Sequence, residues 1–193
     1  EYKHKNKINN HYFDTSKKLI DYFEDKYQER YLVISSRFYY SIENFYFFDQ
    51  DNKLVSEDKK YFYMSNIHVN FINSVSPDTK IIFIPDVPTP PMSLKKCVDN
   101  LKISSPHLYS CNYNSSEFFS KRMKTFLMFK DFEKKYKNVY IFDFADYICE
   151  NNTCSYFYDE YKPIYSRKNH FSIEYSNYMN DIFFNFFKNL DKN

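Results

Sequence analysis

Glycine is absent from this chain of 193 residues, and so is tryptophan. A P-loop, a dinucleotide-binding Gly-x-Gly-x-x-Gly turn and a Gly-x-Ser-x-Gly nucleophile elbow all use glycine for close backbone approach or for a positive φ. The chain therefore contains none of these three motifs. Backbone positions that need a positive φ fall to asparagine and aspartate, so we expect turns at Asp51–Asn52 and at Asn151–Asn152.

The chain also lacks an excess of charge of one sign and a long apolar run. Its net charge is +2, from 27 basic and 25 acidic residues that alternate along the sequence, so a nucleic-acid partner is not expected. No apolar stretch reaches the length of a membrane span, and no signal peptide is visible. Because the chain begins at Glu1 rather than at a methionine, we expect a fragment or a processed product.

Aromatic residues are abundant, with 22 phenylalanines and 21 tyrosines. Each buried ring removes a large apolar area from water, so we expect a core built from rings and isoleucine. The length suits one domain over residues 1–193, in which the polar residues 1–13 fray.

The four cysteines predict two local disulfides, Cys97–Cys111 and Cys149–Cys154, because each pairing closes a short loop. Disulfides imply an oxidising compartment. Zinc is the competing interpretation, since His107 lies near Cys111, but a Cys-x-x-Cys pair and a second nearby histidine are missing. Free buried thiols are the third alternative. No metal and no cofactor are expected.

The order of apolar patterns predicts an α/β fold. We expect helices over 14–27, 56–74 and 116–136 and from Ser172 onwards, strands over 31–34, 80–84 and 139–142, and an irregular excursion over 92–114. Strands separated by helices imply a three-layer α/β/α sandwich with a mainly parallel sheet. Ligands of such sheets bind beyond the carboxyl ends of the strands. The residues that follow the three strands are Ser36, Arg37, Asp86, Asp143 and Asp146.

The helix over 116–136 is expected to bury one apolar stripe. Its predicted inward residues are Phe119, Met123, Phe126, Leu127 and Phe132.

Five segments, in order from about residue 30 to residue 180, resemble those of one known family. They are LVISSRF at 32–38, IPDVPTPP at 84–91 followed by Cys97, FDFADYIC at 142–149, NNTC at 151–154 and PIYSRKNHFS at 163–172. The pattern is similar to the SGNH domain of the acyltransferase-3 membrane O-acyltransferases, within the SGNH/GDSL hydrolase superfamily.

The resemblance implies an SGNH-hydrolase-like fold and transfer of an acyl group, usually acetyl, to a hydroxyl of a cell-surface polysaccharide. It implies a location on the periplasmic or extracellular side of a bacterial membrane. The partners would be an acyl donor, a carbohydrate acceptor and the membrane acyltransferase domain of the same parent protein.

By the same resemblance, His170 is the expected general base. Asp143 or Asp146 would orient it, since the family's usual carboxylate position is occupied here by Arg167, and an arginine cannot accept the imidazole N–H. Arg37 is the expected oxyanion or substrate contact.

No nucleophile is identified in this chain, because the family's serine stands in a Gly-Asp-Ser turn and no Asp-Ser pair occurs here. We therefore expect that the family's first strand lies before Glu1, or that the domain has lost catalysis and binds or scaffolds a carbohydrate.

Overall fold

The computed structural model describes residues 31–35, 38, 42, 47, 53–104, 111–159, 162–167 and 170–191. The helix expected over 14–27 and the turn expected at Asp51–Asn52 lie outside these residues. The chain packs as two compact units. We call residues 1–86 and 121–143 the sheet unit, and residues 87–120 and 144–193 the hairpin unit. One domain over residues 1–193 stays a prediction.

The sheet unit is built on a parallel sheet in the order β1-β2-β4. Its strands are β1 (Tyr31–Ser35), β2 (Lys80–Ile84) and β4 (Val139–Ile141). β2 lies in the middle, with Val33 opposite Ile82 on one side and Tyr140 opposite Ile82 on the other. These are the three strands that the apolar runs predicted, and the parallel pairing is confirmed.

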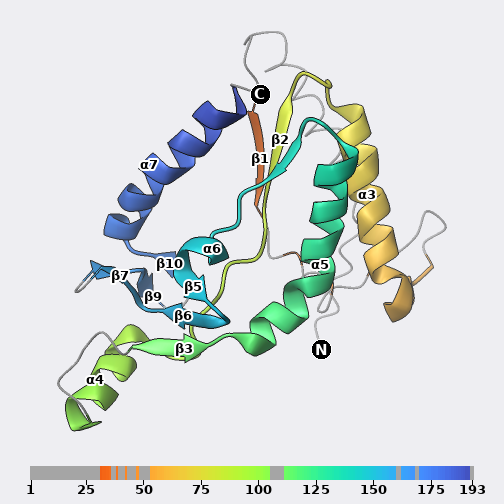
Figure 1. Cartoon of the computed structure of the whole chain (residues 1–193). Helices are drawn as coiled ribbons and strands as arrows, with labels where there is room; N and C mark the ends of the chain where they lie inside the picture. The colour runs from red at the N-terminus through yellow and green to blue at the C-terminus, as the bar shows by residue number, and fades with distance from the viewer. Residues whose placement is uncertain are drawn as a thin grey trace. The chain divides into compact units, whose positions relative to one another are not determined.

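Two long helices of the sheet unit lie side by side against β2 (Figure 1). The 3-10 turn η1 (Glu57–Lys59) leads into α3 (Lys60–Ser74), and α5 (Ser116–Lys135) enters the unit at Lys121. Both helices match their predicted ranges to within a few residues. Rings from each meet in the core, where Phe129 of α5 stacks on Phe83 of β2 at 4.7 Å between ring centroids.

His68 of α3 lies within this aromatic core. Its ring contacts those of Phe83 and Phe129 at centroid distances of 5.6 and 5.9 Å. The Nδ1 atom lies 2.8 Å from the carbonyl oxygen of Met64, one helical turn earlier, which satisfies the buried imidazole as an N–H donor. Burial lowers the pKa of His68 below its ordinary 6.5, so the folded chain holds this ring neutral.

The buried stripe of α5 differs from the predicted one. The buried residues are Arg122, Thr125, Phe129 and Phe132. Phe132 was predicted correctly, but Met123 and Leu127 were predicted wrongly, since they are 48% and 53% exposed. Two polar residues take the inward face because their polar atoms are satisfied there.

The hairpin unit contains only antiparallel pairings among its described strands. β3 (Asn112–Asn114), β6 (Thr153–Ser155) and β5 (Cys149–Glu150) form one sheet in the order β3-β6-β5. Two further hairpins pair β7 (Phe157–Asp159) with β8 (Lys162–Pro163), and β9 (Tyr165–Arg167) with β10 (His170–Phe171). The α/β class is therefore confirmed, while the mainly parallel character holds for the sheet unit alone. The three-layer sandwich stays a prediction.

Three helices complete the hairpin unit. They are α4 (Leu94–Ser104), α6 (Ala145–Ile148) and α7 (Ile173–Leu190). The expectation of an irregular excursion over 92–114 was wrong for α4, which forms between the proline-rich loop and Cys111. Ser172 caps α7 as predicted, because its Oγ accepts from the Tyr175 N–H at 3.0 Å.

Candidate functional site

Three tyrosines hold the proline-rich loop inside the hairpin unit. The Tyr165 hydroxyl donates to the carbonyl of Pro88 at 2.8 Å, and the Tyr156 hydroxyl donates to the carbonyl of Met92 at 2.9 Å. The hydroxyls of Tyr113 and Tyr165 lie 3.0 Å apart. The loop is thus held at Pro88 and Met92 by tyrosines of the segment that precedes His170.

These phenols are structural donors at neutral pH. Burial raises the pKa of Tyr113 to about 12. Burial, followed by the neighbouring Tyr113, raises the pKa of Tyr165 further. A phenol with a raised pKa keeps its proton, so these tyrosines hold the loop in place rather than take part in acid–base exchange at neutral pH.

His170 lies in β10, opposite Arg167 of β9, and its side chain is exposed. The Ser166 hydroxyl bridges the turn, at 3.4 Å from the His170 carbonyl and 3.2 Å from the Phe171 carbonyl. Two residues later Ser172 starts α7, and its N–H donates to the Ile164 carbonyl at 2.8 Å. The imidazole therefore lies on a hairpin that these hydrogen bonds hold in place, which we call the tied hairpin, and its exposed ring is accessible to a substrate. Within the described part of the chain, no side chain makes a hydrogen bond or an ion pair with this ring.

The carboxyl ends of β2 and β4 carry a buried ion pair. The Arg122 guanidinium donates from Nη1 and Nη2 to the two carboxylate oxygens of Asp143, at 3.0 and 2.6 Å. It also donates to the backbone carbonyl of Asp86 at 3.1 Å. Both oxygens of Asp143 are thus occupied by one guanidinium, in the two-pronged geometry that arginine and carboxylate favour.

Both expected disulfides are present. Cys97 of α4 is bonded to Cys111, and Cys149 of β5 is bonded to Cys154 of β6. The second bond closes the β5–β6 hairpin, whose turn has positive φ at Asn151 (48°) and Asn152 (64°), as the absence of glycine predicted. The cysteines of the described residues are all paired, so the zinc and free-thiol alternatives are not needed.

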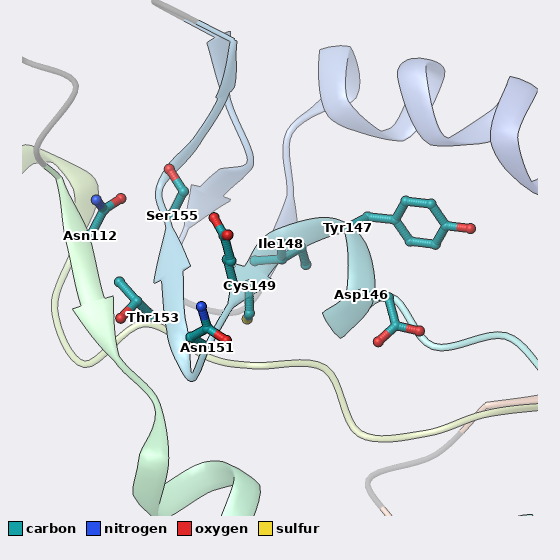
Figure 2. A pocket seen from close by; sticks show the side chains of 9 residues that line it. Asn112, Asp146, Tyr147, Ile148, Cys149, Asn151, Thr153 and Ser155 are labelled. Carbon is teal, nitrogen blue, oxygen red and sulfur yellow. The ribbon is translucent and has the colours of Figure 1, made fainter.

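A polar cavity of about 590 Å³ opens beside this hairpin (Figure 2). Its walls come from β3, α6 and the β5–β6 hairpin, and they include the following residues: Asn112, Asp146, Tyr147, Glu150, Asn151, Thr153 and Ser155. Asp146, an expected orienting carboxylate, lies in this wall. No pattern in the sequence predicted the cavity.

The other expected site residues are distributed as follows. His170 and Asp146 belong to the hairpin unit, and Asp143 belongs to the sheet unit. Arg37 lies outside the described residues. Arg122 was not expected. Its spacing of three, seven and ten residues from Thr125, Phe129 and Phe132 is the helical signal that would have placed it on the buried face.

The described residues contain neither a candidate metal site nor a candidate membrane span. They contain no group of three or more potential metal-ligating side chains. Among their helices, none combines the length and the apolar composition needed to cross a bilayer.

A parallel sheet, two disulfides and a surface histidine on a tied hairpin define the class of this protein as a disulfide-bonded α/β domain. A family model described as the SGNH domain fused to AT3 domains matches residues 2–185. The chain belongs to this family, which confirms the resemblance, and it is an acyltransferase-associated domain. Searches among curated proteins and solved structures found no match.

Proposed function

We propose that this chain is the extracytoplasmic SGNH domain of an O-acyltransferase that transfers an acetyl group to a hydroxyl of a cell-surface polysaccharide. The observation that carries the proposal is the family match over residues 2–185, because domains of this family are fused to AT3 domains. The AT3 domain is the proposed membrane partner that supplies the acyl group. The two disulfides support a periplasmic or extracellular location, since such bonds persist in oxidising compartments.

In this proposal His170 is the general base that takes the proton of the attacking hydroxyl. Its exposed ring and its tied hairpin support the role, because a base must reach the proton that it removes. Asp143 already accepts from Arg122 with both oxygens, so Asp146 is proposed as the orienting carboxylate, and since it makes no hydrogen bond to the His170 ring in this structure, it would do so only once substrate is bound. Arg37 is proposed as the oxyanion contact, and no residue is assigned as the nucleophile.

A second candidate function is a non-catalytic domain that binds or scaffolds the polysaccharide. Two features of the sequence favour it. No glycine is available for a Gly-Asp-Ser turn, and Arg167 stands where the family's pattern has a carboxylate. A cation at that position disfavours the imidazolium that forms when a histidine acts as a base.

The deciding experiment measures O-acetyl groups on the surface polysaccharide of cells that make this protein. Three changes are made in the chromosomal gene: a deletion, His170→Ala and Glu174→Gln. Glu174 is exposed in the first turn of α7 and serves as the matched control. The O-acetyl content is measured by NMR of the purified polysaccharide, and the amount of each protein by immunoblot.

We expect the deletion and His170→Ala to remove the O-acetyl groups and Glu174→Gln to leave them. A general base typically contributes about 10²–10⁴-fold to a rate, so its loss is visible even in a whole-cell assay. If the deletion removes the groups and His170→Ala does not, the scaffolding function is correct. A deletion strain that keeps its full O-acetyl content overturns both.

A further inference from the structure

Tyr165 of β9 joins the tied hairpin to two other segments of the hairpin unit. Its side chain is 4% exposed, and its hydroxyl donates to the Pro88 carbonyl of the proline-rich loop at 2.8 Å. The Tyr113 hydroxyl of β3 lies 3.0 Å from the same phenol oxygen. Since a phenol has one proton and Tyr165 gives it to Pro88, Tyr113 is the donor to Tyr165. The two bonds form a buried chain in which each bond polarises the other.

The first donor of this chain belongs to the disulfide-closed sheet β3-β6-β5. Tyr113 lies opposite Cys154 of β6, which is bonded to Cys149 of β5. The side chains of Tyr113 and Cys154 are both buried. A side chain buried among close-packed neighbours has little freedom to move, so Tyr113 offers Tyr165 a donor at a fixed place. The Tyr165 hydroxyl therefore fixes the tied hairpin to this sheet and to the proline-rich loop at one point.

Tyr165 lies opposite Phe171, the neighbour of His170, in the register of the tied hairpin. The Phe171 ring packs among three others, with centroid distances of 5.8 Å to Tyr165, 5.4 Å to Phe144 and 5.1 Å to Tyr175. The preceding residue, His170, is exposed. Successive side chains of a strand point to opposite faces, so the packing of Phe171 among these rings turns the His170 imidazole toward solvent.

A β-bulge lies between Tyr165 and the residue opposite His170. Arg167 is opposite His170 and Tyr165 is opposite Phe171, so Ser166 is the extra residue of the bulge. The Ser166 hydroxyl lies 3.4 Å from the His170 carbonyl and 3.2 Å from the Phe171 carbonyl, which holds the bulge in place. A bulge sets the direction of the side chains beside it, so a movement of Tyr165 at one end of the bulge changes the direction of the imidazole at the other.

From these contacts we propose that Tyr165 is a positioning residue for His170. Its hydroxyl, in addition to its ring, holds the tied hairpin against the proline-rich loop and β3, and this contact fixes the direction of the imidazole. Tyr165 is buried and acts through His170 rather than on a substrate. The inference rests on the proposed function for the role of His170 as the general base, while the positioning itself is measured without any reaction.

Tyr156 provides a matched control for this role. Its hydroxyl donates to the Met92 carbonyl of the same loop at 2.9 Å, so Tyr156→Phe removes the same kind of bond as Tyr165→Phe. Tyr156 lies between β6 and β7, outside the tied hairpin. Both changes keep the ring and the backbone, so the two variants should fold and should lose similar stability to urea. A role of Tyr165 in stability alone would show equally in both.

NMR of the whole chain, labelled with 13C and 15N, measures the position of His170 in each variant. The Cε1–Hε1 signal of this ring is assigned, among the five histidines, as the signal that His170→Ala removes. The exchange rate of the Ser172 amide reports opening of the tied hairpin, because this N–H donates to the Ile164 carbonyl at the base of the hairpin.

We expect Tyr165→Phe to shift or split the His170 ring signal and to raise the exchange rate of the Ser172 amide by about tenfold, as the loss of a buried hydrogen bond predicts. Tyr156→Phe should leave the ring signal in place and the exchange rate within about threefold of the original. The inference is wrong if Tyr165→Phe leaves the His170 signal unchanged, or if Tyr156→Phe changes that signal as much.

The O-acetyl assay separates this inference from the proposed function. With equal amounts of protein, we expect Tyr165→Phe to lower the O-acetyl content at least about tenfold and Tyr156→Phe to keep it, since a misplacement of about 1 Å can cost about 10²-fold in rate. A His170 signal that changes in Tyr165→Phe, with O-acetyl groups unaffected by His170→Ala, supports the positioning and overturns the catalytic proposal. If His170→Ala removes the O-acetyl groups and Tyr165→Phe keeps them, the catalysis is supported and the positioning role is overturned.

Discussion

The buried pair of Arg122 and Asp143 offers the sharpest test of what holds the sheet unit together. The two residues are 5% and 6% exposed, and two parallel hydrogen bonds join them. Arg122→Met keeps the length and the apolar part of the side chain but leaves the Asp143 carboxylate without the guanidinium. Breaking a buried pair in this way costs about 3–5 kcal/mol, because an uncompensated charge stays away from water.

The reverse change and the double change complete the cycle. Asp143→Leu leaves a buried guanidinium and costs a similar amount. Arg122→Met/Asp143→Leu removes both charges together, and such replacements are often neutral or stabilising by about 1–4 kcal/mol. The coupling free energy of the pair is therefore expected to reach several kcal/mol. Arg122→Lys is a useful fourth variant, since one ammonium cannot reproduce the two parallel bonds to the carboxylate.

The free energy of unfolding is measured by urea denaturation followed by circular dichroism. If a single variant fails to fold, its free energy of unfolding is not measured. A double variant that folds where that single variant does not then shows the coupling between Arg122 and Asp143. The reasoning is refuted if Arg122→Met costs less than about 1 kcal/mol, or if the double variant loses the sum of the two single losses.

Three further predictions concern stability. Because burial keeps His68 neutral in the folded chain while the unfolded chain protonates it below about pH 6.5, stability falls as the pH drops through that value, by at most about 1.4 kcal/mol per pH unit. Urea midpoints at several pH values should show a flatter profile for His68→Phe, and parallel profiles would refute this. Ser172→Ala removes the cap of α7 and the hydroxyl's bond to the Pro163 carbonyl, and should cost about 1 kcal/mol in the same assay, while Asn177→Ala on the exposed surface of α7 should cost less than half as much. Replacing Cys149 and Cys154 by alanine should cost about 2 kcal/mol, against about 3 kcal/mol for the longer loop closed by Cys97 and Cys111, and equal losses would contradict the loop-length argument.

The parts of the fold that were predictable are those set by local patterns. The run KIIFI over 80–84 is short, apolar and followed by Pro85, a combination that favours a buried strand. Ser172 follows the histidine block and precedes a long amphipathic stretch, so the start of α7 was readable from the sequence. Both disulfides were predictable because each closes a local loop. The positive φ of Asn151 and Asn152 was predictable because the chain has no glycine for that turn.

The parts that were missed depend on residues far apart in the sequence. Arg122 is an ordinary polar residue on α5 until β4 brings Asp143 beside it, 21 positions later, and only that pairing allows it to face the core. The α4 helix was missed because prolines before it, and a disulfide predicted from Cys97 within it to Cys111 after it, suggested an irregular chain. The cavity joins Asn112 of β3 to α6 and the β5–β6 hairpin, more than 30 residues away, and no local pattern encodes that meeting.

The β5–β6 hairpin turns without glycine, through two asparagines with positive φ. Asparagine tolerates a positive φ less well than glycine does, so two consecutive residues in that region add a local cost to folding. The Cys149–Cys154 disulfide offsets such a cost by restricting the unfolded chain, and it does so at the hairpin whose polar face borders the cavity. The turn and the bond therefore act on the same loop in opposite directions, since the turn makes the native backbone of Asn151 and Asn152 more costly and the bond makes the unfolded chain less free.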